Sequence, residues 1–235
     1  MYTDIFSEEI SPVFHKNVCV LSGPNLAKEI IQGLPAVTVV AAGNDTIAEQ
    51  AQSLLSSPKF CVFSNTDVVG VELGGALKNI IALGAGMADG LGYGDNAKAA
   101  FMTRGLAEIA SLGIAAGANP LAFSGLAGLG DLVVTCSSSL SRNHYVGVEL
   151  AGGRTLKDIS ASMHNIAEGV TTTTATIQMA QELGVEMPIT EVIYRILFQG
   201  LDVRQAVTEL MENPAGKELD ILDSKACYNL SKSPL

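Results

Sequence analysis

The pattern of hydrophobic residues changes near residue 66, and this change constrains the fold more than any other feature of the chain. Before it, short strand-like runs at 17–21, 36–41 and 60–63 alternate with helical segments at 24–33 and 45–56. Such alternation is typical of the βαβ pattern of an α/β layer. After residue 66 the segments are rich in Ala, Leu, Ile and Gly and follow a helical period. They cover residues 67–88, 95–117, 119–128, 141–152, 155–163, 168–184, 189–199 and 203–212.

We therefore expect a mainly helical protein in which an α/β remnant precedes a larger all-α domain. The α/β part, 1–66, is a thin unit that begins abruptly, so we interpret it as the closing portion of a larger sheet. The all-α domain is expected to span 67–213. The polar segment 214–235 is predicted to be a disordered tail.

Composition excludes several classes of protein. Hydrophobic residues make up 48% of the chain and charged residues only 16%, which supports a sizeable core. The net charge of −10, without any Lys/Arg-rich run, argues against nucleic-acid and membrane-surface binding. The 4 cysteines form no C-x-x-C pair, which favours a reducing compartment and gives no metal signature. No apolar run approaches the length of a membrane span, so we expect a soluble cytoplasmic protein.

Lys78 lies inside the apolar segment 71–87, with Gly74 and Gly75 one helical turn before it. A helical lysine leans over those two positions. Because glycine is costly in a helix interior, we expect both to leave space for a neighbouring helix or for a ligand beside the ammonium. Burial disfavours the charged form and makes a lysine a usable general acid or base. The alternative is a lysine at the helix edge that snorkels to water, and this segment alone does not separate the two.

A possible anion site follows the stretch 125–132, in which Asp131 is predicted to end a glycine-rich turn. Ser141 has the features of a helix N-cap, with Arg142 and Asn143 in the first turn. A basic residue is unfavourable there unless an anion is present, and free N–H groups beside a guanidinium suit a phosphate. The simpler alternative is a serine-rich capping loop with an exposed arginine.

Glu168 opens another helix, where its carboxylate complements the helix dipole or hydrogen-bonds a ribose hydroxyl. His15, His144 and His164 are isolated in the sequence. No P-loop, G-x-S-x-G elbow or strict G-x-G-x-x-G motif occurs. Function must therefore be inferred from Lys78 and the segments that follow it.

Taken together, these segments resemble the bacterial-type NAD(P)-dependent glycerol-3-phosphate dehydrogenases. The matching stretches are LSGPNLAKE (21–29), GVELGGALKN (70–79), GAGMADG (84–90), TRGLAE (103–108), GLAGLGDL (125–132), SRN (141–143), AEGV (167–170) and GVEMPIT (184–190). They occur in the family's order and spacing. Singly these motifs are weak, and jointly they are specific.

The resemblance implies that Lys78 is the catalytic lysine, which exchanges a proton with the C2 oxygen of the substrate. It implies a site for sn-glycerol 3-phosphate lined by Gly23, Asn25, Lys78, Asp131, Ser141, Arg142 and Asn143. It implies contacts of NAD or NADP with Ala27, Arg142, Ile166 and Glu168. The implied reaction interconverts dihydroxyacetone phosphate and sn-glycerol 3-phosphate, which supplies glycerol phosphate for phospholipid synthesis.

The sequence departs from the family in two respects. Asn25 stands where the family usually has Ser or Thr. The family also begins with a complete Rossmann domain that carries a glycine fingerprint and a further substrate-binding lysine, whereas 1–66 resembles only the later strands of that domain. Two alternatives therefore stay open: a truncated, inactive helical substrate-binding or interaction module, and a related hydroxy-acid dehydrogenase. A homodimer and the choice between NAD and NADP also stay open.

Overall fold

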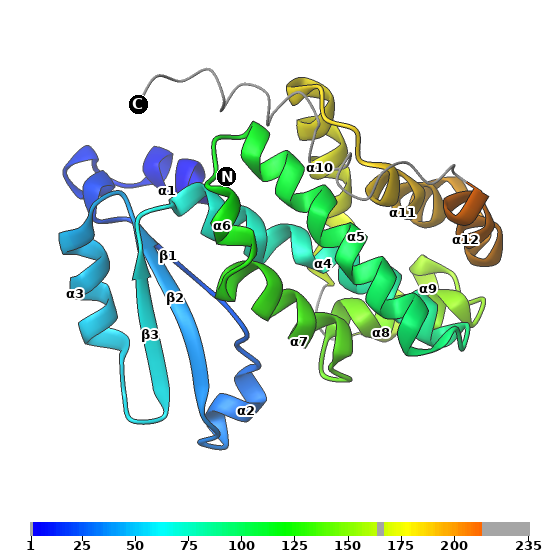
Figure 1. The fold of residues 1–235 in the computed structure, drawn as a ribbon, viewed down its shortest axis with the longest axis horizontal. Helices are drawn as coiled ribbons and strands as arrows, with labels where there is room; N and C mark the ends of the chain where they lie inside the picture. The colour runs from blue at the N-terminus through cyan, green and yellow to red at the C-terminus, as the bar shows by residue number, and fades with distance from the viewer. Residues whose placement is uncertain (1, 164–166, 213–235) are drawn as a thin grey trace.

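The computed structural model describes residues 2–163 and 167–212. Its first part is a small sheet with short helices (Figure 1). In chain order the elements are α1 (Tyr2–Glu9), the 3₁₀ turn η1 (Pro12–Asn17), β1 (Cys19–Ser22), α2 (Ala27–Ile31), β2 (Ala36–Ala42), α3 (Asp45–Leu55) and β3 (Phe60–Asn65). The sequence predicted the strands and α3, whereas α1 and η1 were not predicted.

The three strands lie in the order β1-β2-β3, with β2 and β3 parallel and β1 antiparallel to β2. The βαβ interpretation is therefore wrong for the first two strands. The reason is that α2 has 5 residues instead of the predicted span 24–33. A helix of that length rises only about 7.5 Å, too little to carry the chain back along the sheet. The helix α3 covers one face of the sheet, and the helical part covers the other (Figure 1).

Within 67–163 and 167–212 the second part consists of helices joined by turns and contains no strand, as expected. Its elements are α4 (Val68–Gly90), α5 (Gly94–Ala115), α6 (Pro120–Phe123), the π-turn η2 (Leu126–Gly130), α7 (Asp131–Ser137), α8 (Arg142–Ala151), α9 (Leu156–Ser162), α10 (Glu168–Leu183), α11 (Pro188–Gln199) and α12 (Val203–Glu212). The predicted helix 119–128 is broken, because glycines interrupt it and a π-turn leads directly into α7, which the sequence did not predict. Asp131 is consequently the first residue of a helix and not the end of a turn.

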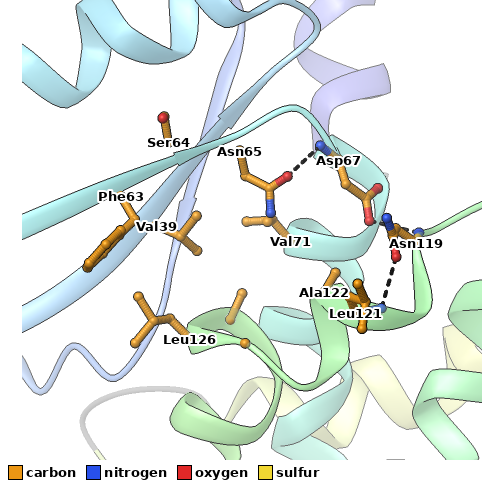
Figure 2. Close-up of a pocket in the computed structure, with 12 residues that line it drawn as sticks. Val39, Phe63, Ser64, Asn65, Asp67, Val71, Asn119, Leu121, Ala122 and Leu126 are labelled. Atoms are coloured by element: carbon orange, nitrogen blue, oxygen red, sulfur yellow. Dashed lines mark hydrogen bonds between the residues drawn. The ribbon is translucent and has the colours of Figure 1, made fainter.

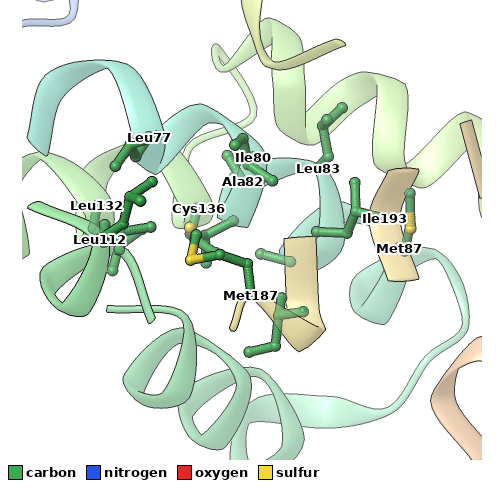
Figure 3. Close-up of a cluster of buried hydrophobic side chains, with 14 of the residues drawn as sticks. Leu77, Ile80, Ala82, Leu83, Met87, Leu112, Leu132, Cys136, Met187 and Ile193 are labelled. Carbon is green, nitrogen blue, oxygen red and sulfur yellow. The ribbon is translucent and has the colours of Figure 1, made fainter. Parts of the chain in front are cut away.

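The central helix is α4, whose side chains form much of the core with those of α5, α7 and α11 (Figure 3). Helix α8 crosses it closely because two glycines meet. A Cβ atom on Gly147 would lie 2.0 Å from the Leu83 carbonyl oxygen, and one on Gly86 would lie 2.0 Å from that of His144. Because neither glycine has a Cβ atom, the backbones of α4 and α8 can approach each other this closely.

By length and composition, α4 and the stretch Pro120–Ser137 are apolar enough to cross a membrane. The expectation that no apolar run approaches that length is therefore wrong. Of the apolar window of α4, 72% is buried inside the protein, against 39% for Pro120–Ser137. The apolar surface of α4 is thus used for packing, as in a core helix.

The boundary predicted near residue 66 coincides with the passage from β3, which ends at Asn65, to α4, which begins at Val68. The division into two domains at this point stays a prediction. Ile166 and the tail 214–235 lie outside the described residues.

Candidate active site

Lys78 and Asp131 form an ion pair between α4 and α7. The Lys78 Nζ atom donates a hydrogen bond to the Asp131 carboxylate, and their side chains are 16% and 4% exposed. The same carboxylate accepts a bond from Thr135 Oγ1 at 3.2 Å and another from the backbone N–H of Gly23. The acid therefore joins the end of β1 to two helices.

Burial raises the pKa of the Asp131 carboxyl group, and this effect outweighs the opposing influence of Lys78, Thr135 and the Gly23 N–H. A buried acid of this kind depends on its cationic partner to remain ionised. Removing either member would leave a charge uncompensated in the interior, which typically costs about 3–5 kcal/mol. The snorkelling alternative for Lys78 is thus disfavoured, because its ammonium points to an internal acid.

The two glycines before Lys78 differ in role. A Cβ atom on Gly74 would lie 2.8 Å from the Ala127 carbonyl oxygen, so this glycine admits the π-turn against α4. A Cβ atom on Gly75 would lie 2.2 Å from Ser22 Oγ at the end of β1. Gly74 therefore serves packing and not a ligand, whereas Gly75 also lines a pocket.

This pocket, of about 400 Å³, opens between β1, α4, α7 and α10. The predicted residues on its wall are Gly23, Asn25, Lys78, Asp131 and Glu168. The structure thus brings together five predicted side chains and backbone groups from segments that are far apart in the sequence. Residues with polar groups from these segments therefore line one space, as in small-molecule sites.

Asn25 has one satisfied and one unsatisfied polar atom. Its Nδ2 group donates to Thr38 Oγ1 at 2.8 Å, and that hydroxyl donates to the Ser22 carbonyl oxygen at 2.7 Å. The Oδ1 atom is shielded from solvent and has no partner among the residues that the structure describes. A buried acceptor left without a donor costs about 1–3 kcal/mol.

The N-terminus of α8 lies beside this pocket. Ser141 is its N-cap, as predicted, and its Oγ atom accepts a bond from the His144 N–H at 3.2 Å. The guanidinium of Arg142 lies 3.6 Å from the carboxylate of Glu168, and these side chains are 49% and 58% exposed. In this structure the carboxylate of Glu168 is an anionic partner of Arg142, and the predicted phosphate site at Arg142 stays a prediction. An exposed pair is worth about 0–1 kcal/mol, so a ligand can displace it.

Asn143 is buried and does not line the pocket. Its Nδ2 group donates to Asn79 Oδ1 at 2.8 Å, and its Oδ1 atom accepts from the Gly169 N–H at 2.9 Å. It therefore fastens α8 to α4 and to the start of α10, and it holds Asn79, which is on the pocket wall. Ala27, another predicted contact, is the first residue of α2 and is not on that wall.

Three further residues support the site and were not predicted from the sequence: Thr38, Asn79 and Thr135. Asn79 directly follows Lys78, and Thr135 lies one turn after Asp131, so recognition of α7 as a helix would have indicated the latter. No local pattern indicates Thr38, because its hydrogen-bond partners, Ser22 and Asn25, lie on a different segment.

A second hollow, of about 300 Å³, lies between β3, the start of α4 and the region of α6 (Figure 2). Its polar groups serve local structure. Asp67 accepts bonds from the N–H groups of Gly70 and Asn119 at 2.9 Å, and Asn65 Oδ1 accepts from the Asp67 N–H at 2.9 Å. Its lining contains no lysine, arginine or histidine, so it lacks the charges that a phosphorylated ligand needs.

Another polar cluster fixes the far end of α4. Asp89 accepts bonds from Lys98 at 2.8 Å, and its carboxylate lies 2.7 Å from His144 Nε2. Partial burial acts to raise the pKa of Asp89, but the bonds from Lys98 and His144 outweigh it and lower the pKa. Within 2–163 and 167–212, no group of three or more His, Cys, Asp or Glu side chains could hold a metal ion.

Comparison with known proteins gives the family. The model of the NAD-dependent glycerol-3-phosphate dehydrogenase C-terminus matches residues 67–208, and that of the N-terminus matches 1–48. The chain belongs to this family. A glycerol-3-phosphate dehydrogenase (NAD(P)+) of Dehalococcoides mccartyi is 58% identical over 217 residues, which is 92% of this chain and 60% of the relative. One of Geobacillus thermodenitrificans is 52% identical over 221 residues, which is 94% of this chain and 64% of the relative.

Solved structures of the dehydrogenase family share the fold. The crystal structure of glycerol-3-phosphate dehydrogenase from Coxiella burnetii has a TM-score of 0.81 at 40% identity, over 83% of this chain and 60% of that one. The yeast enzyme has a TM-score of 0.73 at 28% identity, over 82% of this chain and 59% of that one. The chain therefore spans about three fifths of the length of the dehydrogenases it matches.

Proposed function

We propose that the chain carries the substrate-binding and proton-transfer part of an enzyme that interconverts dihydroxyacetone phosphate and sn-glycerol 3-phosphate. The observation that carries this proposal is the buried Lys78–Asp131 pair on the wall of a polar pocket. A protonated lysine held in this way can transfer a proton to an oxygen atom in the pocket. The relatives, which are named as glycerol-3-phosphate dehydrogenases, support the choice of substrate.

The chemistry of Lys78 follows from its partner. In the reductive direction its ammonium gives a proton to the carbonyl oxygen at C2, so that the ketone becomes a secondary alcohol and the lysine becomes neutral. Asp131 orients the ammonium by accepting its hydrogen bond. The nicotinamide cofactor, when bound, supplies the hydride that C2 receives.

Arg142 and the N-terminus of α8 are proposed to hold the phosphate of the substrate, together with Ser141 and Asn143. The phosphate would replace Glu168 as the anionic partner of Arg142, at little cost because that pair is exposed. Binding energy from the phosphate then holds the carbonyl near Lys78, which favours reaction by orientation.

The residues present fit only one end of NAD or NADP. Glu168 is half-exposed on the pocket wall, paired with Arg142, and so offers polar groups to a ribose or a carboxamide. We propose contacts there and at Ala27 and Ile166. The sequence contains no strict G-x-G-x-x-G loop for the pyrophosphate. This absence favours a second candidate for the chain as printed, a substrate-binding module without turnover. In either case we propose a cytoplasmic protein.

The test follows oxidation of NADH and NADPH with dihydroxyacetone phosphate. It uses the chain as printed and the chain preceded by the N-terminal portion of the Dehalococcoides mccartyi relative. We expect turnover in the extended protein and a loss of about 10²–10⁴-fold in Lys78→Met, because a positioned acid is worth that much. The exposed Lys157→Met is the matched control and should leave the rate unchanged. Full activity of Lys78→Met would refute the mechanism.

Substrate choice separates the alternatives. A phosphate site at Arg142 predicts strong preference for dihydroxyacetone phosphate over dihydroxyacetone, and equal turnover would indicate a dehydrogenase of another class. Calorimetric titration of this chain with sn-glycerol 3-phosphate tests the remaining candidate, a module that binds the substrate without turnover. Binding without turnover would identify a substrate-binding module.

A further inference from the structure

His144 lies in the first turn of α8, directly after the residues proposed to hold the phosphate, and its ring contacts another helix. The ring Nε2 atom lies 2.7 Å from a carboxylate oxygen of Asp89 at the far end of α4, and the side chain is 13% exposed. Lys98 on α5 donates to the same oxygen at 2.8 Å. A histidine that is isolated in the sequence therefore takes part in joining α8 to α4 and α5.

The direction of the bond between His144 and Asp89 follows from the charge of the acid. Partial burial acts to raise the pKa of Asp89, but the bonds from Lys98 and His144 outweigh it and lower the pKa. An ionised carboxylate has no proton, so it can only accept. The Nε2 atom must therefore carry a proton, whether the ring is neutral or charged, and donate it in a charge-assisted bond.

The crossing of α8 and α4 leaves the angle between these helices poorly fixed. They meet at Gly86 and Gly147, where each glycine faces the backbone of the other helix. The angle between packed helices is normally set by ridges of side chains that fit into grooves. Glycine supplies no such ridge, so polar contacts beside the crossing help to fix the direction of α8.

Two polar contacts of this kind leave the first turn of α8 in opposite directions along α4. Asn143 donates to Asn79 Oδ1 at 2.8 Å, before the crossing, and His144 reaches Asp89 beyond it. Asn79 and Asp89 are roughly 15 Å apart along the axis of α4, from the rise of a helix per residue. Contacts on both sides of a crossing resist rotation of α8 about it, whereas one contact alone would let the helix swing.

We infer that His144 is a positioning residue for the proposed phosphate site. Its contact with Asp89 holds the start of α8 at the angle at which Arg142 faces the ligand. The inference rests on the proposed function, because it takes the phosphate to bind at Arg142. That guanidinium lies 3.6 Å from the carboxylate of Glu168 on the pocket wall, so a swing of α8 would carry it away from the pocket. His144 acts on the ligand only through α8.

The experiment measures the dissociation constant of the full chain for sn-glycerol 3-phosphate by calorimetry. It compares His144→Gln, whose amide NH₂ group can take the place of Nε2, with His144→Asn, whose shorter side chain keeps the amide but does not reach Asp89. Asp89→Ala, alone and with His144→Asn, tests whether both residues act through one contact. Arg142→Gln tests the phosphate site itself. The matched control is His15→Asn, because His15 is exposed and contacts a nearby backbone oxygen, that of Ile10, at 3.1 Å.

His144→Asn should weaken binding about tenfold, within the range found for residues that act on a site without touching the ligand. His144→Gln should retain most of the affinity, which a general loss of packing would not allow. Asp89→Ala and the double variant should weaken binding no more than His144→Asn, and His15→Asn should leave it unchanged. Circular dichroism checks that each variant is folded, and Asp89→Ala reports on the same contact if His144→Asn does not fold.

Four results would overturn the inference. If Arg142→Gln loses binding and His144→Asn does not, the proposed function stands and the role of His144 is wrong. Equal weakening in His144→Asn and His144→Gln would assign His144 to packing alone. If Arg142→Gln binds as tightly as the unsubstituted chain, the phosphate does not bind at α8. If the unsubstituted chain does not bind the ligand, the proposed function fails and the inference fails with it.

Discussion

Glu108 is a buried acid that caps the N-terminus of α11, a helix far from it in the sequence. Its substitution gives a quantitative test of the structure. It lies on α5 and is 4% exposed. Its carboxylate accepts bonds from the N–H groups of Ile189 and Thr190 at 2.7 and 2.8 Å, and from the Thr190 hydroxyl at 2.7 Å. These N–H groups belong to the first turn of α11, where they have no partner within their own helix.

Burial raises the pKa of Glu108 from 4.5 to about 7, against the opposing effect of these three hydrogen bonds. In the unfolded chain Glu108 keeps its ordinary pKa of 4.5. Between pH 4.5 and about 7 the folded protein therefore binds the proton of this carboxyl group more tightly than the unfolded chain does. The resulting stability is fully present below pH 4.5 and is lost as the pH rises through about 7. Between about pH 5 and about pH 8 the unfolding free energy should therefore fall by roughly 2–3 kcal/mol on account of this group.

The substitution Glu108→Gln removes the ionisation and keeps one acceptor oxygen. Urea unfolding followed by circular dichroism, since the chain has no tryptophan, gives the free energy at each pH. We expect the unfolding free energy of the unsubstituted protein, relative to that of Glu108→Gln, to fall by roughly 2–3 kcal/mol from about pH 5 to about pH 8. The raised pKa of Asp131 affects both proteins alike and cancels. Parallel pH dependences would refute the reasoning, as would an equal effect of the exposed Glu49→Gln.

Two further predictions concern the core. Gly147→Ala should destabilise the protein by about 3 kcal/mol or more, because its Cβ atom would overlap the Leu83 carbonyl oxygen and the backbone cannot yield. Urea unfolding measures this effect, and Gly43→Ala, where the added atom meets open space, should cost far less. Burial raises the pKa of the Cys136 thiol to about 12, so iodoacetamide should label the exposed Cys61 in the native protein and spare Cys136, as read by peptide mass mapping. Early labelling of Cys136 would contradict its place in the core.

Local patterns predicted those parts of the protein that depend on local interactions. The period of apolar residues indicated α4 and α5, because each buries a long surface, and Ser141 was recognisable as an N-cap from its side chain alone. The resemblance to the dehydrogenase family implied that Lys78 and Asp131 belong to one site, and the structure pairs them.

Features that depend on distant segments could not be predicted in this way. The antiparallel direction of β1 relative to β2 depends on how the chain turns around α2, a helix of 5 residues. The period of apolar residues does not indicate such a turn. Helix α7 has 7 residues and begins within a glycine-rich stretch, so its pattern is too short to distinguish from a loop. The bonds from Asn25 to Thr38 and from Thr190 to Glu108 join segments whose approach no local rule gives.

The position of Asp131 depends on Gly74, a residue that takes no part in the reaction but allows the turn before α7 to pack against α4. The π-turn that precedes α7 lies against α4 only because Gly74 has no side chain. A methyl group there would push this turn outward, and Asp131, which directly follows it, would move with it. Lys78 would then lose its carboxylate partner although neither charged residue had changed. A glycine at position 74 is therefore as necessary for a buried, oriented ammonium as the acid itself, and Gly74→Ala should impair ligand binding in the same way as removal of the acid.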